Sequence, residues 1–218
     1  MQGGLWYFLT MFGSIIALII GYLSITGERQ ANALNTLITK PVYRDSVING
    51  KLLGDVGFLS FFFLVMSLIY TSGMILVVGG AIGPILESYI LSIPVSILLS
   101  LFCVMIFYSF ALLTTILIKR QTVSLFTCAI VWLLLTEVIP TTDFGWYIGA
   151  LFGESVNAVW DMVSMICPTY ILLPVFRSNG GDLIHTLFSF NGSVLLLIVY
   201  FIVILFVNYI TFLRSDIA

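Results

Sequence analysis

Five long apolar runs alternate with polar connections along this chain. A helix needs about 20 mostly apolar residues to cross a bilayer, and each run is close to that length. The runs cover residues 5–25, 56–78, 89–118, 123–139 and 194–213. Because helices satisfy their backbone hydrogen bonds internally within a bilayer, the pattern predicts an all-α polytopic membrane protein. We expect a single transmembrane domain over residues 1–218.

The composition points to the same class. Hydrophobic residues make up 61% of the chain and charged residues 8%, whereas soluble domains carry about 25% charged residues. The three cysteines, Cys103, Cys128 and Cys167, have unrelated spacings and predict neither a disulfide framework nor a metal site. The single histidine, His185, has no ligand partner at a suitable spacing and is expected at an interface.

Two polar connections stand out by length. Residues 26–54 hold Arg29, Lys40, Arg44 and Lys51, which are half of the 8 Lys and Arg residues. Residues 140–192 are too long for a simple turn and too apolar for a free loop. We expect short re-entrant or interfacial helices there, before the last span.

The basic residues predict the orientation. All but Arg177 of the 8 Lys and Arg residues fall on one side of the predicted spans, and that side is expected to be cytoplasmic. The C-terminus would then lie inside a plasma membrane. Trp6 and Tyr7 would form an aromatic belt at the outer end of the first span. A span so close to an outside N-terminus is awkward to insert, so we expect a further span before it; a five-span protein is the alternative.

The polar connection also contains an amphipathic pattern. If residues 28–40 form a helix, one face carries Ala31, Leu34, Leu37 and Ile38, and Pro41 ends the helix. Such a helix lies either in the lipid headgroups or in a groove of a cytoplasmic partner.

This stretch resembles the region after the second span of ABC type-2 transporter permeases. Their pattern reads roughly E-R-x-x-G-T-L-E-x-L-L-x-x-P-V-S-R, with G-K about six residues later. The matching residues are Glu28, Arg29, Leu34, Leu37, Ile38, Pro41, Val42 and Arg44, followed by Gly50 and Lys51. The sequence departs from the pattern at Asn32, Ala33 and Asn35.

Two looser features extend the resemblance. Lys119 and Arg120 match a basic turn between two spans of the family, and residues 167–169 (Cys-Pro-Thr) stand where an Asn-Pro-Thr-like triplet is common. The general layout is similar to that of the permease of nitrous-oxide-reductase maturation.

The resemblance implies the permease subunit of an exporter that a separate cytoplasmic ABC ATPase subunit drives. ATP and Mg²⁺ would bind that partner and not this chain. The ATPase would contact Glu28, Arg29, Leu34, Leu37, Ile38, Pro41, Arg44 and Lys51. A second permease copy, or a homologous permease, would complete a dimer in the lipid bilayer.

Several other features bear on function. The chain has no G-x-x-x-x-G-K-[ST] loop and no hydrolase motif, so we expect neither an enzyme nor a nucleic-acid partner. The spans lack the paired charges of an ion-coupled carrier. A scaffold subunit without transport and a passive or ion-coupled transporter are the remaining alternatives. Glu137 is read either as an interfacial residue or as a functional one.

Smaller details concern helix packing. Lys51 and Asp55 are four residues apart and are expected to pair, with a snorkelling lysine as the alternative. Small residues within the spans are expected at helix contacts; these are Ser60, Ser67, Gly73, Ser96, Ser100 and Ser109.

Overall fold

The computed structural model describes residues 2–30, 44–78, 83–118, 120–139, 147, 149–151, 167–171 and 190–214. These ranges contain helices and no β-strand. The elements are α1 (Gln2–Gln30), α3 (Arg44–Val78), α4 (Gly83–Leu117), α5 (Gln121–Leu133), the π-helix η2 (Leu134–Val138), α8 (Pro168–Ile171) and α10 (Phe190–Arg214).

Five stretches are long and apolar enough to cross a membrane. They are Gly4–Gly27, Gly50–Val77, Ile93–Leu117, Gln121–Val138 and Val194–Thr211. Each coincides with one apolar run of the sequence. The expected class, an all-α polytopic membrane protein, is therefore confirmed.

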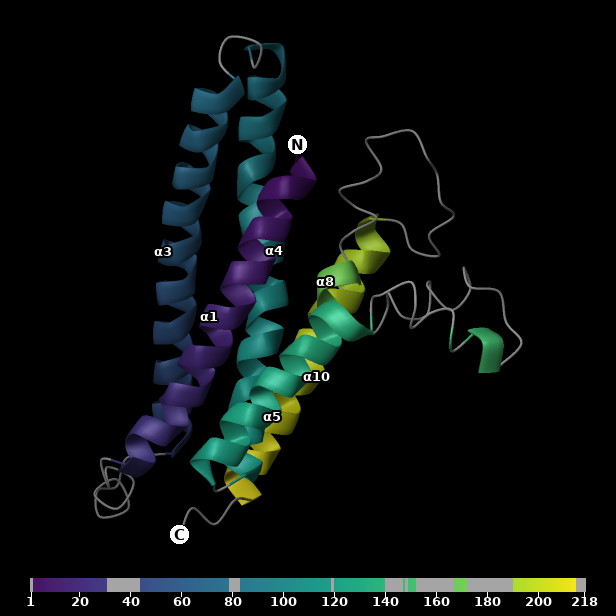
Figure 1. Ribbon diagram of the computed structural model, residues 1–218. Helices are drawn as coiled ribbons and strands as arrows, with labels where there is room; N and C mark the ends of the chain where they lie inside the picture. Colours follow the sequence, from purple (N-terminus) through teal and green to yellow (C-terminus); the bar gives the residue numbers. More distant parts are fainter. Residues whose placement is uncertain are drawn as a thin grey trace.

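Successive long helices run in opposite directions (Figure 1). α1, α4 and α10 end, and α3 and α5 begin, at the lower end of the bundle in Figure 1. We call this the inner end and the opposite end the outer end, following the predicted orientation.

The α4 helix is the centre of the bundle. It contacts α1, α3, α5, α8 and α10, and its residues 103–109 are all buried. Val104, Met105 and Tyr108 face a cluster shared with α1 and α3. Cys103 and Phe107 face a second cluster shared with α5, α8 and α10. A helix that is apolar on every side is expected at such a central place.

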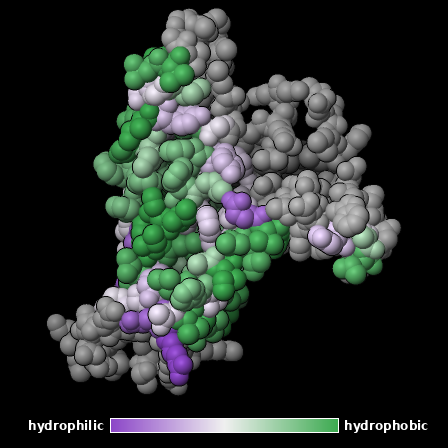
Figure 2. Space-filling model, in the orientation of Figure 1, coloured by the Kyte–Doolittle hydropathy of each residue, from purple (hydrophilic) through white to green (hydrophobic). Residues whose placement is uncertain are grey.

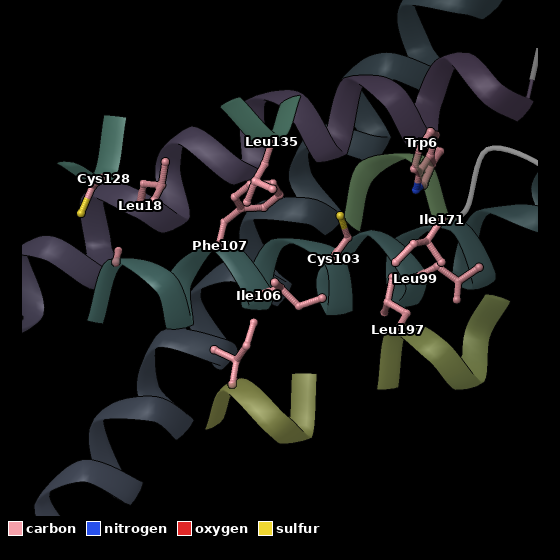
Figure 3. Packing of buried hydrophobic residues seen from close by; sticks show 12 residues of the cluster. Trp6, Leu18, Leu99, Cys103, Ile106, Phe107, Cys128, Leu135, Ile171 and Leu197 are labelled. Carbon is pink, nitrogen blue, oxygen red and sulfur yellow. The ribbon is translucent and has the colours of Figure 1, made fainter. Parts of the chain in front are cut away.

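The second cluster corrects one expectation from the sequence. Trp6 is only 2% exposed and gathers with Leu99, Ile171 and Leu197 at the outer end of the cluster (Figure 3). Tyr7, the next residue, is 53% exposed. Consecutive helical residues point about 100° apart, so the pair cannot share one environment. Trp6 is a core residue and not part of a surface belt.

Small residues within the spans divide into two groups. Ser67, Ser96, Ser100 and Ser109 are buried, as expected of residues at helix contacts. Gly73 is not, because a Cβ added there would meet nothing within 4 Å in the chain. Gly73 therefore makes no helix contact with the described part of this chain.

The α4–α5 hairpin is tight. α4 ends at Leu117 and α5 begins at Gln121. Ile118 N–H donates to the carbonyl of Thr114 at 2.9 Å, and Ser124 N–H donates to the carbonyl of Arg120 at 3.0 Å. Lys119, half of the expected basic turn, lies outside the described residues.

On the face shown in Figure 2 the surface of the bundle is mainly apolar, with hydrophilic residues at its lower end and in a small patch at mid-height. Among the described side chains of α3, only Leu59, Phe63 and Ser67 are buried. Large exposed apolar side chains follow the rest of this helix, including Leu53, Phe58, Phe61, Leu64, Leu68 and Leu76. Such a surface suits lipid or another membrane subunit.

Candidate coupling site

The two helices that flank the basic connection reach into it from both sides. α1 continues to Gln30, and α3 begins at Arg44. Of the residues expected to contact an ATPase, Glu28 and Arg29 lie in the last turn of α1, and Arg44 is the first residue of α3. Four others lie outside the described residues, namely Leu34, Leu37, Ile38 and Pro41.

Lys51 lies in α3 close to the connection. Its Nζ donates a hydrogen bond to the backbone carbonyl of Ser24 in α1. Ser24 is buried, so the ammonium group reaches back across the contact between the two helices. The two spans that enter the connection are thereby joined to each other at the inner end.

Asp55 lies one helical turn further along α3. The hydroxyl of Tyr108 donates to its Oδ2 at 2.6 Å. This is the short distance of a charge-assisted bond, and Tyr108 is only 1% exposed. The expected pairing of Lys51 with Asp55 therefore gives an incomplete account, because each residue has a partner on another helix.

Reasoning from the sequence missed Tyr108 as a partner. It lies in the middle of an apolar run with nothing nearby in the sequence to single it out. Asp55 did indicate a polar contact, since placing an acidic residue at the edge of a span costs free energy unless the residue is paired. This cost predicts that a partner exists but does not say which helix carries it.

Further polar contacts connect helices in this inner half. Tyr22 Oη donates to the carbonyl of Gln121 at 3.3 Å. Thr114 Oγ1 and Cys128 Sγ lie 2.7 Å apart, joining α4 to α5. Asn208 Nδ2 of α10 donates to the carbonyl of Ser109 at 2.8 Å.

At the outer end, the Cys-Pro-Thr triplet is packed into the bundle. α8 contacts α4, η2 and α10, and Cys167, Pro168 and Thr169 are all buried. Burial disfavours the charged thiolate and raises the pKa of the Cys167 thiol to about 11. A buried thiol of this kind is a structural group and not a reactive one.

The two remaining residues that the sequence singled out are Glu137 and His185, and the structure describes only the first. Glu137 lies in η2 and is exposed; a π-type bond from Ile139 N–H to the carbonyl of Leu134, 2.9 Å long, closes this turn. His185 lies outside the described residues. Within the ranges that the structure describes, no group of three His, Cys, Asp or Glu residues could hold a metal ion.

Comparison with known proteins supplies the family. A family model described as "ABC-2 family transporter protein" matches residues 4–217. A comparison with curated proteins gave no match. The matched range includes all five candidate spans and the basic connection between α1 and α3, so the chain belongs to the ABC-2 transporter family.

Proposed function

We propose that this chain is the permease subunit of an ATP-driven exporter and that energy enters it through residues 26–54. A separate cytoplasmic ABC subunit would bind and hydrolyse ATP with Mg²⁺, since this sequence has no P-loop of its own. The chain would move the substrate without catalysing a reaction.

One observation carries this proposal beyond the family. α1 and α3 run without a break from the connection into the bundle, and Lys51 bonds the two together next to it. A force on the connection would therefore act on two spans at once. This is the mechanical arrangement that a coupling element needs.

The contact with the ATPase is proposed at the eight residues that match the family pattern. The apolar ones are Leu34, Leu37, Ile38 and Pro41, and the charged ones are Glu28, Arg29, Arg44 and Lys51. Apolar side chains would enter a groove of the partner. The charges would set its orientation on the membrane surface.

The test is a pair of double variants purified in a mild detergent. Leu34→Asp with Leu37→Asp places two charges on the apolar face of the predicted helix. Thr36→Asp with Thr39→Asp adds the same charges at the same spacing on its polar face. We expect the first variant to lose the co-purifying ATPase and the second to retain it. Only in the first variant would binding bury the new carboxylates in the groove of the partner, where they would lose their hydration.

The outcomes separate the candidate functions. Retention of a Walker A-containing partner by the Leu34/Leu37 variant contradicts the coupling assignment. An unmodified protein that co-purifies with a stable partner lacking any nucleotide-binding motif supports the scaffold alternative instead.

A second permease copy, or a homologous one, is proposed as a further partner. The exposed apolar surface of α3 and of α5 is compatible with such a contact, since much of that surface is uncovered among the residues that the structure describes. Native mass spectrometry of the complex from nanodiscs tests this. Two permease chains for each pair of ATPase chains are expected, and one permease chain would contradict the dimer.

We also propose that the protein lies in the plasma membrane and that its inner end faces the cytoplasm. The basic residues of the connections support this orientation. A cysteine placed at Ala218 should react with an impermeant maleimide only after the cells are opened. Labelling in intact cells would contradict the proposed orientation and place the C-terminus outside.

A further inference from the structure

Contacts from three helices converge on one turn of α4. Asp55 of α3 accepts a hydrogen bond from the hydroxyl of Tyr108 at 2.6 Å. Asn208 of α10 donates to the carbonyl of Ser109, the next residue, at 2.8 Å. Gly21 of α1 packs on the same turn, because a Cβ added there would lie 2.8 Å from the Tyr108 carbonyl oxygen.

This turn is also close to the proposed coupling segment. Lys51 and Asp55 follow the first residue of α3, Arg44, by seven and eleven positions. At 1.5 Å per residue these positions lie about 10 Å and about 17 Å along the helix axis. The sequence from Arg44 to Val78 contains no proline that would kink the helix between Arg44 and Asp55.

α3 meets the rest of the bundle along one side. The buried or interhelically bonded positions are Lys51, Asp55, Leu59, Phe63 and Ser67, and the neighbouring apolar positions that pack against the cluster shared with α1 and α4 are Leu52, Val56, Phe62, Met66 and Tyr70. Leu59 and Phe63 make apolar contacts, which are non-directional. The Asp55 carboxylate and the Tyr108 hydroxyl add a directional bond, which defines the position of α3 along α4 at this turn.

We propose that the hydrogen bond between Asp55 and Tyr108 transmits displacement of the coupling segment to α4, and that both are positioning residues for the ATP-driven transition. This inference rests on the proposed function. α3 would carry the displacement from Arg44 towards the outer end, and the bond would pass it to α4, which contacts α1, α3, α5, α8 and α10. Asn208 would carry it on to α10.

Cys103 provides a reporter on α4. It lies five residues from Tyr108 towards the outer end and is 0% exposed. In a background with Cys128→Ala and Cys167→Ala it is the remaining cysteine of the chain. Its labelling by a membrane-permeable maleimide therefore measures movement of α4 when ATP is added to the permease–ATPase complex.

The test compares two tyrosine variants in this background. Tyr108→Phe removes the bond between α3 and α4. Tyr22→Phe is the matched control, because it also removes an interhelical tyrosine hydroxyl bond in the inner half, but one between α1 and α5. We expect the ATP-dependent change in Cys103 labelling to fall by on the order of tenfold in Tyr108→Phe, the factor that one hydrogen bond to a charged group controls. Tyr22→Phe should retain the response.

Asp55 gives an independent check on the same bond. Asp55→Asn should reduce the response as Tyr108→Phe does, and Asp55→Glu should restore at least part of it because the carboxylate is kept. A merely structural role would leave the ratio of Cys103 response to ATP hydrolysed unchanged in every variant that folds.

The outcomes distinguish this inference from the proposed function. If the unmodified chain retains no ATPase, the proposed function fails and this inference fails with it. If the ATPase is retained and hydrolyses ATP, but Tyr108→Phe keeps the full Cys103 response, only the inference is overturned. An unmodified complex with no ATP-dependent change at Cys103 also overturns it, since α4 would not move.

Discussion

The backbone of α1 at Gly21 packs directly on the backbone of α4 at Tyr108. A Cβ atom added to Gly21 would lie 2.8 Å from the Tyr108 carbonyl oxygen and 2.9 Å from the Cβ of Ala111. Both are shorter than an ordinary van der Waals contact, and neither neighbouring atom is the flexible end of a long side chain. Glycine is therefore required there by the approach of the two helices.

This contact predicts opposite effects for two glycine substitutions. Gly21→Ala should destabilise the protein by about 1–3 kcal/mol, because overpacking forces the helices apart. Gly73→Ala should raise stability by about 0.5–1 kcal/mol, since a methyl group meets nothing within 4 Å there and alanine favours the helix. Unfolding midpoints in a denaturing detergent series measure both. Stabilisation by Gly21→Ala would contradict the close approach.

A second prediction concerns Trp132 and Ser14. The indole N–H of Trp132 in α5 donates to the Ser14 hydroxyl of α1 at 2.8 Å. A double-mutant cycle with Trp132→Phe and Ser14→Ala should give a coupling of about 0.6 kcal/mol, the average for such bonds in membranes. The control cycle pairs Trp132→Phe with Thr127→Ala, whose hydroxyl bonds to Val123 within α5, and should give none. Equal coupling in the two cycles would mean that Trp132 acts through α5 alone.

A third prediction compares two replacements at Asn208. Its Nδ2 donates to the Ser109 carbonyl, while its buried Oδ1 has no hydrogen-bond partner among the described residues. Asn208→Leu loses the donor but also removes the unpaired acceptor, so it should change stability by less than about 1.5 kcal/mol. Asn208→Asp keeps the shape but directs an acceptor at a carbonyl.

We therefore expect Asn208→Asp to be the more destabilising of the two at neutral pH, by about 1–3 kcal/mol. Thermal unfolding of both variants in the same detergent provides the comparison. An aspartate variant as stable as the leucine variant would show that the Ser109 contact is absent in the membrane.

The fourth prediction uses the pKa of Cys167. Burial raises this pKa to about 11, so the reactive thiolate is scarce at neutral pH and increases tenfold with each pH unit up to that value. In a variant with Cys103→Ala and Cys128→Ala, alkylation by iodoacetamide should still be rising at pH 10. After unfolding, the rate should level off near pH 9, as for an ordinary thiol. A plateau near pH 9 in the folded protein would contradict the burial of Cys167.

The sequence predicted only part of the geometry around the connection between α1 and α3. The family pattern singled out residues 28–51, and Lys51 among them takes part in the contact between α1 and α3. It did not reveal the partners of Lys51 and Asp55, because these lie on other helices. Ser24, the partner of Lys51, is 27 residues away in the sequence, and Tyr108, the partner of Asp55, is 53 residues away. The contact of all eight expected residues with an ATPase stays a prediction, and four of them, Leu34, Leu37, Ile38 and Pro41, lie outside the described residues.

The sequence by itself determined the class of this protein, and its apolar runs overlap the five candidate spans found among the described residues. The bilayer makes this possible, since each span must be a long apolar helix whatever it packs against. Only the tertiary structure decided that α4 is central, that Trp6 is buried while Tyr7 is exposed, and that Gly21 rather than Gly73 lies at a helix contact. In lipid both faces of a span are apolar, so the choice of neighbour depends on shape and on a few polar bonds that no linear pattern displays.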